Sequence, residues 1–242
     1  MHGFPGYERN LDLAQVLRRA GYAALVFDQR GVWGTAGSWS IAHMLEDSAR
    51  VVAVIRTESV AVAHRLDGRR VAVLGHSLGE FAALMTAAAD LAVAAVISVV
   101  AVEIGAAADI CRSDPAARSA YVTALDGQLL PADQDRASGE MLPVRRVSGE
   151  SLVAEAEHAG PAWRLTALGP RLAHRPVLLI AGSRDTGAPA AVHYQPLVDA
   201  YRAAGCARLE HHLLAAGHDL SSERVSLART VLGFLGRNLP SK

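Results

Sequence analysis

Residues 71–79 read Val-Ala-Val-Leu-Gly-His-Ser-Leu-Gly and are followed by an Ala-rich stretch at 81–89. The apolar, β-branched start is typical of a buried strand, and the Ala-rich stretch is typical of a helix. Between them stands Ser77, flanked by Gly75 and Gly79, where larger side chains would collide across a tight turn. A strand, a sharp turn and a helix in this order expose the serine hydroxyl. The pattern predicts a nucleophilic serine; the alternative is an ordinary strand-to-helix turn.

Length and composition are those of one domain with a sizeable core. The chain has 242 residues, of which 51% are hydrophobic, and 24 Lys and Arg balance 24 Asp and Glu. This balance indicates neither a nucleic-acid partner nor a membrane-surface partner. No apolar run is long enough to span a membrane, no signal peptide is visible, and two cysteines give no disulfide framework. We therefore expect a single cytoplasmic domain over residues 1–242, and the oligomeric state stays open.

Strand-like and helix-like segments alternate along most of the chain. Apolar runs predict strands at 22–27, 70–74, 93–102, 176–181 and 207–214. Amphipathic spacing predicts helices at 10–20, 41–56, 189–204 and 221–235, the third disturbed at Pro196. Such alternation predicts an α/β fold, with a mainly parallel sheet covered by helices on both faces.

The segment at about 103–170 interrupts this alternation. It is rich in Ala, Asp, Ser and Gly and contains no clear strand, whereas 116–125 and 151–158 could form helices. Long loops inside a compact domain are usually functional or structured. We expect a helical cap inserted between two strands, rather than a long disordered loop.

The residues around Ser77 resemble those of two families. Residues 75–84, Gly-His-Ser-Leu-Gly-Glu-Phe-Ala-Ala-Leu, are similar to the nucleophile segment of malonyl-CoA:acyl-carrier-protein transacylases. Residues 75–79 equally resemble the nucleophile elbow of α/β-hydrolases, which more often have Gly where this chain has Glu80. A transacylase should also have a Gly-Gln-Gly-Ser-type loop near its start and an Arg in an apolar helix after the serine. Neither is present, and the α/β-hydrolase pattern recurs at four further places.

Two of these places imply partners for the serine. Residues 177–185 end in Asp185 and resemble the family's acid segment, and residues 213–218 end in His218, in the loop after the next strand. The family order is serine, acid, histidine, and parallel strands share one carboxyl edge, where we expect the three residues to meet. The resemblance implies that Ser77 is the nucleophile, His218 the base and Asp185 the acid that orients it. Glu103, after the preceding strand, is the alternative acid.

The third place implies an oxyanion hole. Residues 2–6, His-Gly-Phe-Pro-Gly, match the family's His-Gly loop, which supplies a backbone N–H to the substrate oxygen. The resemblance implies that Phe4 is this donor and that Leu78, after the nucleophile, is the second.

The fourth place is residues 27–34, Phe-Asp-Gln-Arg-Gly-Val-Trp-Gly, which resemble the family's Asp-x-Arg-Gly-x-Gly loop. The resemblance implies that Asp28 and Arg30 brace the oxyanion loop. Trp33 and Trp39 either line the substrate pocket or pack beneath it.

The start of the chain departs from the family pattern. Three strands normally lead to the His-Gly loop, but here only Met1 precedes His2, so the first two strands and nearly all of the third are missing. The third strand normally separates the strands predicted at 22–27 and 70–74, and its loss would leave unpaired backbone groups. We expect the natural protein to be longer; the alternative is a closed-up sheet with an altered oxyanion loop.

The resemblance implies a serine hydrolase of carboxylic esters or amides, similar to small bacterial-type hydrolases related to acylaminoacyl and dipeptidyl peptidases. The expected substrate is a small ester or a short peptide, with no cofactor. We expect no metal site, because His211 and His212 on one strand face opposite sides. Two alternatives remain: an acyltransferase or thioesterase acting on a thioester carrier, suggested by residues 80–84, and a truncated, non-catalytic binding protein.

Overall fold

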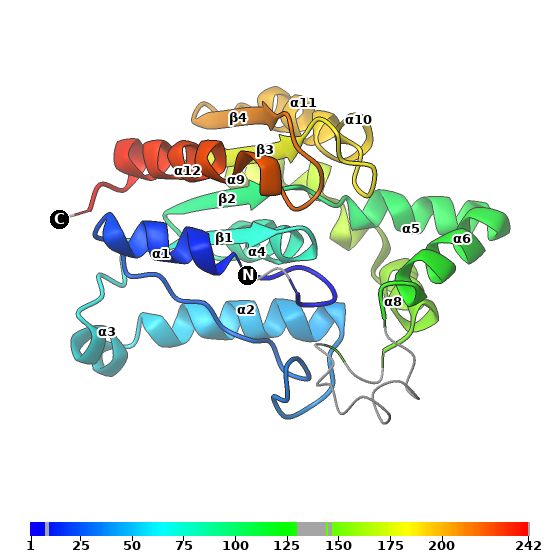
Figure 1. Ribbon diagram of the computed structural model, residues 1–242, viewed down its shortest axis with the longest axis horizontal. Helices are drawn as coiled ribbons and strands as arrows, with labels where there is room; N and C mark the ends of the chain where they lie inside the picture. Colours follow the sequence, from blue (N-terminus) through cyan, green and yellow to red (C-terminus); the bar gives the residue numbers. More distant parts are fainter. Residues whose placement is uncertain (8–9, 130–143, 145–146, 242) are drawn as a thin grey trace.

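The computed structural model describes residues 1–7, 10–129, 144 and 147–241. At its centre lies a sheet of parallel strands, which are neighbours in the order of the chain (Figure 1). These strands are β1 (Ala72–His76), β2 (Ala95–Val99), β3 (Val177–Gly182) and β4 (Leu209–Leu214). Since all four described strands run in one direction, the loops after them gather at one edge of the sheet.

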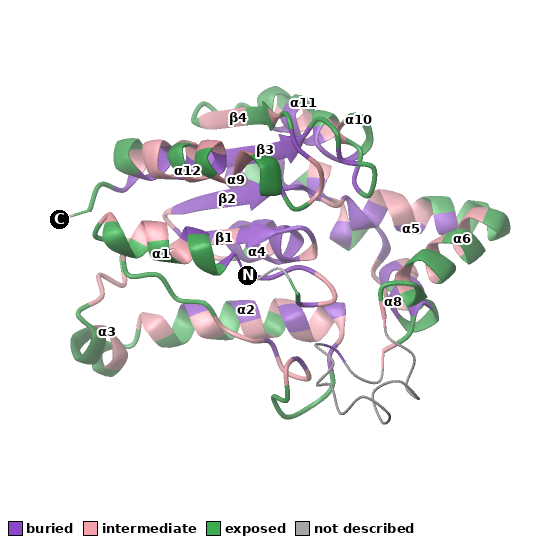
Figure 2. Cartoon of the chain, viewed as in Figure 1, coloured by how far each residue is buried: buried purple, intermediate pink, exposed green. Residues whose placement is uncertain are grey.

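The two inner strands are apolar because helices cover both of their faces. Every residue of β2 and of β3 is buried, whereas β4 at the edge of the sheet is only partly covered (Figure 2). Parallel strands that are buried on both faces read as continuous apolar runs, as the sequences of β2 and β3 do. The predicted α/β architecture with a mainly parallel sheet is confirmed.

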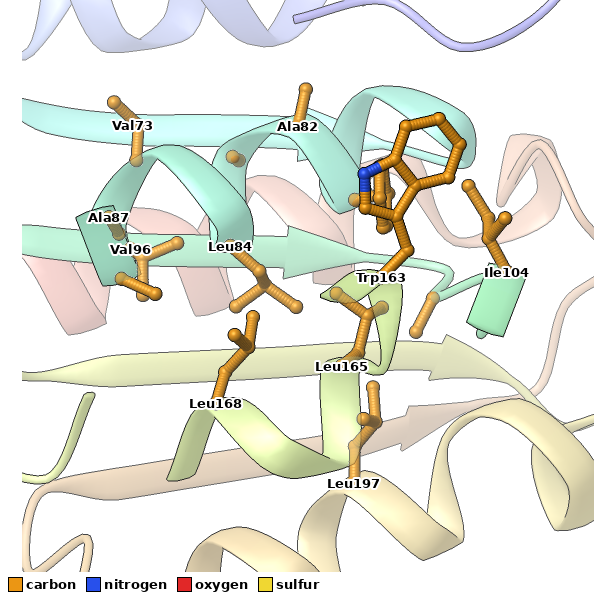
Figure 3. Packing of buried hydrophobic residues seen from close by; sticks show 14 of the residues in the cluster. Val73, Ala82, Leu84, Ala87, Val96, Ile104, Trp163, Leu165, Leu168 and Leu197 are labelled. Carbon is orange, nitrogen blue, oxygen red and sulfur yellow. The ribbon is translucent and has the colours of Figure 1, made fainter. Parts of the chain in front are cut away.

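One face of the sheet packs against α1 (Leu11–Arg19) and α12 (Arg224–Asn238). The other face packs against α2 (Ile41–Ile55), α4 (Leu78–Ala89) and α11 (Gln195–Ala203). Figure 3 shows this second core, where Leu84 of α4 and Leu197 of α11 gather beside the sheet. Leu165 and Leu168, from the segment before β3, pack with them. The shorter elements are α3 (Glu58–His64), α10 (Ala190–His193) and η3 (Ser221–Glu223).

The helix predicted at 189–204 is indeed interrupted, at Tyr194, and Pro196 stands in the first turn of α11. Proline lacks an N–H and fits the first turn of a helix, so a new helix starts there. None of the helices in the described ranges is long and apolar enough to cross a membrane.

The described residues between β2 and β3 form several helices. They contain α5 (Ile104–Ser113), α6 (Pro115–Asp126), α8 (Gly149–Ala159), η1 (Gly160–Trp163), η2 (Leu165–Leu168) and α9 (Gly169–Leu172). The helices expected at 116–125 and 151–158 correspond to α6 and α8, whereas α5 was not expected. In Figure 1, α5, α6 and α8 lie beyond the arrowheads of the strands. Residues 130–143 of the segment lie outside the described residues.

Trp163 and Glu155 are among the residues that join the insertion to the body. The ring of Trp163 lies edge-on to that of Phe81 in α4, with 5.4 Å between the centroids. The carboxylate of Glu155 in α8 accepts the backbone N–H groups of Ile41 and Ala42 at 2.9 and 2.8 Å. It thereby caps the N-terminus of α2, where unpaired N–H groups favour a negative charge.

The strand predicted at 22–27 is wrong. These residues form no strand, and Leu25 and Val26 are 58% and 40% exposed. The free edge of β1 is met by Met1, whose amino group donates to the carbonyl of Leu74 at 2.6 Å. The N–H of His76 donates in turn to the carbonyl of Met1 at 3.2 Å. A strand needs a hydrogen-bonded neighbour, and within the described chain residues 22–27 have no ladder partner.

Candidate active site

The elbow at Ser77 connects the end of β1 to the start of α4. Ser77 has φ 53° and ψ −131°, a conformation that costs a non-glycine residue of the order of 1–3 kcal/mol and that clusters at functional sites. A Cβ atom added to Gly75 would lie 1.9 Å from the carbonyl oxygen of Gly79. The two glycines therefore allow the tight turn that the sequence predicts.

The side chain of His218 lies within hydrogen-bonding distance of two side chains from distant parts of the chain. His218 Nε2 is 2.9 Å from Ser77 Oγ, and His218 Nδ1 is 2.8 Å from Asp185 Oδ2. Each residue follows a strand: Ser77 follows β1, Asp185 follows β3 and His218 follows β4. In this geometry an imidazole that holds its proton on Nδ1 can accept the serine proton on Nε2.

The carboxylate of Asp185 is fixed by its own loop. Its side chain is fully shielded from solvent, and Oδ1 accepts the N–H groups of Gly187 and Ala188, both at 2.8 Å. These bonds leave Oδ2 facing the imidazole of His218. Such an arrangement can hold the imidazole of His218 in one tautomer and one orientation.

Glu103, the alternative acid, lies elsewhere and has a different set of partners. Its carboxylate accepts the backbone N–H groups of Leu165 and Ala106, at 2.5 and 2.9 Å. It therefore caps α5 and ties it to η2. Burial raises the pKa of Glu103 above its usual value.

The loop at residues 2–6 lies directly against the elbow. A Cβ atom on Gly3 would lie 2.8 Å from Ser77 Cβ and 3.3 Å from Ser77 Oγ. A Cβ atom on Gly79 would lie 2.4 Å from the carbonyl oxygen of His2. Phe4 follows Gly3 in this loop, and Leu78 opens α4. The backbones of both expected oxyanion donors thus border the serine.

A cavity of about 450 Å³ opens over the serine. Its described lining consists of Gly3, Phe4, Pro5, Tyr7, His76, Ser77, His218 and Asp219. This volume accommodates a small ligand. Four of these residues belong to the loop that starts the chain, and Asp219 is the one acidic residue among them.

Neither tryptophan is among these described lining residues. Trp39 is buried and packs on the ring of Phe4 at 5.4 Å between centroids, and Trp33 Nε1 donates to the carbonyl of Gly6 at 2.9 Å. Both tryptophans therefore contact the loop at residues 2–6. Arg30, expected to brace that loop, instead pairs with Asp47 of α2, its Nε lying 2.8 Å from Oδ1.

Sequence reasoning missed the contacts of two histidines, one to the backbone of His218 and one to the backbone of Glu103. His76, expected only to pack, donates from Nε2 to the carbonyl oxygen of His218 at 2.9 Å. His193, in α10, accepts the N–H of Glu103 on Nδ1 at 3.1 Å, and burial lowers its pKa. Nothing in the sequence distinguishes these two from the other histidines among the ten of the chain.

Glu80 stands out in the sequence as a departure from the family pattern, and the structure shows what it contacts. It is fully buried; Oε2 lies 2.8 Å from Ser98 Oγ, and Oε1 accepts the N–H of Val102 at 2.9 Å. These bonds span the turn at Val100, a β-branched residue with φ 59°. Burial raises the pKa of Glu80 to about 8.

No group of three His, Cys, Asp or Glu side chains suited to a metal ion occurs among the residues that the structure describes. Tyr194 OH and His211 Nδ1 lie 3.0 Å apart, so one strand histidine already has a protein partner.

Solved structures with this fold include enzymes from several sources. An esterase from Pyrococcus furiosus aligns with a TM-score of 0.61 and 16% identity, over 99% of this chain and 80% of that one. A monoacylglycerol lipase from Paleococcus ferrophilus aligns with a TM-score of 0.63 and 16% identity, over 98% and 93%. The alpha/beta hydrolase GrgF from Penicillium sp. sh18 gives 0.64 and 18%, over 98% and 88%.

A search of the curated proteins gave no match. A family model does match, that of the "Alpha/beta hydrolase family", and it spans residues 1–228. The parallel sheet, the elbow at Ser77 and the order of the three clustered residues agree with that match. The chain therefore belongs to the alpha/beta hydrolase family.

Proposed function

We propose that this protein is a serine hydrolase that cleaves small carboxylic esters through an acyl-enzyme on Ser77. The observation that carries the proposal is the continuous chain of contacts from Asp185 Oδ2 through His218 to Ser77 Oγ, at 2.8 and 2.9 Å. A serine hydroxyl is a weak nucleophile at neutral pH, and an oriented imidazole activates it.

The reaction begins when Ser77 Oγ attacks the ester carbonyl and His218 Nε2 takes the hydroxyl proton. Asp185 accepts a hydrogen bond from Nδ1 and stabilises the imidazolium. The carbonyl oxygen becomes an anion, which the N–H groups of Phe4 and Leu78 bind. His218 then protonates the departing alcohol, so an alcohol and the acyl-enzyme form.

The second half repeats these roles with water. His218 takes a proton from water, the resulting hydroxide attacks the acyl carbonyl, and the bond to Ser77 Oγ breaks. The proton returns to Oγ, and a carboxylic acid leaves. This order balances every proton between the imidazole, the serine and the two products.

Esters are favoured over peptides by two observations. The cavity of about 450 Å³ is small for an extended peptide. An esterase and a monoacylglycerol lipase are among the proteins that share the fold. The transacylase alternative required a different fold and is overturned by the family match over residues 1–228. Thioester cleavage on the hydrolase fold and a purely binding role are outcomes of the test below.

The test compares hydrolysis of p-nitrophenyl acetate, a matched p-nitroanilide and acetyl-CoA by the wild type and by Ser77→Ala. We expect the ester to be turned over fastest, with a loss in kcat of about 10⁶ in Ser77→Ala. Faster turnover of the anilide or of the thioester would reassign the substrate. If the folded wild type did no better than Ser77→Ala, a binding role would replace the enzymatic one.

A further inference from the structure

The cavity beside Ser77 has an uneven distribution of charge. Asp219 is its acidic member, and no lysine or arginine stands among its described lining residues. The two lining histidines are already engaged: His218 contacts Ser77 and Asp185, and His76 contacts the carbonyl of His218. The formal charge of this wall is therefore negative when both imidazoles are neutral.

The carboxylate of Asp219 is ionised and exposed. Its Oδ1 accepts the backbone N–H of Ser221 at 3.0 Å, and this bond is the main reason that the pKa of Asp219 lies below its usual value. Asp219 is exposed to solvent, and it directly follows His218 in the chain. A carboxylate beside the reacting centre can interact with a charged part of a bound ester.

The basic side chain of Arg224 contacts the backbone of Asp219 and is not among the described lining residues of the cavity. Arg224 Nη1 lies 3.2 Å from the backbone carbonyl oxygen of Asp219. The same guanidinium pairs with the carboxylate of Asp12, at 2.5 Å from Nη2 to Oδ1, and its Nη1 donates to Asn10 Oδ1 at 3.0 Å. Because Asp12 offsets its charge, Arg224 does not cancel the negative charge of the cavity wall.

Aromatic rings complete this wall. Phe4 and Tyr7 line the cavity, and Tyr7 is 55% exposed. The rings of Tyr7 and Trp33 make a T-shaped contact, with 6.1 Å between their centroids. Such a contact leaves ring surface available, and the face of an aromatic ring attracts cations.

We propose that Asp219, with the rings of Phe4 and Tyr7, selects esters that carry a cationic ammonium group over neutral esters of the same shape. The inference rests on the proposed esterase function, because it concerns the substrate of the same serine. Asp219 acts here as a specificity residue that contacts the substrate, and it takes no part in the transfer of protons. Anionic esters are disfavoured by the same carboxylate.

The test uses acetylcholine and 3,3-dimethylbutyl acetate, which have the same shape and differ in one positive charge. We expect kcat/KM to be about tenfold higher for the cationic ester, which corresponds to about 1.4 kcal/mol. In Asp219→Asn the ratio of the two kcat/KM values should fall several-fold below the wild-type ratio, since only the rings of Phe4 and Tyr7 then attract the cation, and in the wild type it should fall with added salt. The ratio cancels any general loss of activity in the variant.

Asp199→Asn is the matched control, because Asp199 is an exposed aspartate on α11 and does not line the cavity. It should retain the wild-type ratio. A wild-type ratio near one, or an unchanged ratio in Asp219→Asn, would overturn the inference. Failure of the proposed function is a distinct result: neither ester would then be hydrolysed faster than by Ser77→Ala.

Discussion

His76 Nε2 donates a hydrogen bond of 2.9 Å to the backbone carbonyl oxygen of His218, 142 positions further along the chain. The two imidazole rings also meet edge to face, with 5.5 Å between their centroids. The residue before Ser77 thus holds the loop that carries His218. This contact fixes the distance between two parts of the site that no covalent connection keeps together.

We therefore expect His76→Phe to lower kcat although the ring would still pack. The loss of one hydrogen bond of about 1 kcal/mol corresponds to a decrease of roughly five- to tenfold. His76→Gln keeps an N–H donor and should lose less. Steady-state hydrolysis of p-nitrophenyl acetate measures both variants, and full activity of His76→Phe would show that the contact has no role in positioning.

The identity of the acid is tested by Asp185→Asn. Asparagine cannot hold the required tautomer of His218, so we expect kcat to fall by about 10⁴ with little change in the fold. Glu103→Gln is the matched control, because Glu103 bonds to Leu165 and Ala106 and not to the imidazole. A larger loss in Glu103→Gln than in Asp185→Asn would reverse the two assignments.

The oxyanion loop is tested by Gly3→Ala. The new methyl group would stand 2.8 Å from Ser77 Cβ, so the loop or the serine must move. Displacing an oxyanion donor lowers kcat by about 10²–10³, and we expect a loss in that range. Gly236→Ala in α12 has no neighbour within 4 Å of the added atom and serves as the control. Equal kcat in the two variants would place the oxyanion donor outside this loop.

Glu80 makes the stability of the protein depend on pH. Its pKa rises from 4.5 to about 8 on burial, so the folded protein keeps a proton that the unfolded chain releases. The contribution of Glu80 to the free energy of unfolding should therefore be largest below about pH 4.5. This contribution should fall as the pH rises to 8. Glu80→Gln removes this titration and retains an acceptor for Val102 N–H and a donor for Ser98.

Urea unfolding at several values of pH between 5 and 8.5 measures this effect. The wild-type midpoint should decline across the range, and the decline should be smaller in Glu80→Gln. The exposed Glu58, changed to Gln, is the control and should follow the wild type. Identical slopes in all three proteins would mean that Glu80 is already ionised in the folded state.

The parts of the fold that depend on a local sequence pattern could be predicted from the sequence. Ser77, Asp185 and His218 each directly follow an apolar run or lie one short loop after it, and parallel strands bring such positions to one edge. Their relative positions could thus be predicted, although their roles remain a proposal. The break before α11 was predictable for the same local reason, since Pro196 cannot continue a helix.

Other features depend on neighbours that the pattern does not reveal. Residues 22–27 have the composition of a strand, but their state depends on a hydrogen-bonded neighbour that the described chain does not provide. The bond from His76 to His218 and the bond from Glu103 to His193 join loops that meet only after folding. Helix α5 was not predicted, although Ile104, Ala108 and Cys111 have helical spacing and share its buried face.

The proposed mechanism depends on Ser77 being a nucleophile that His218 and Asp185 activate. Treatment with a fluorophosphonate, followed by peptide mapping in a mass spectrometer, tests this most directly. We predict one covalent adduct on Ser77 in the wild type, much slower labelling in His218→Ala and none in Ser77→Ala. An adduct on another residue, or no adduct on a well-folded wild-type chain, would contradict the account.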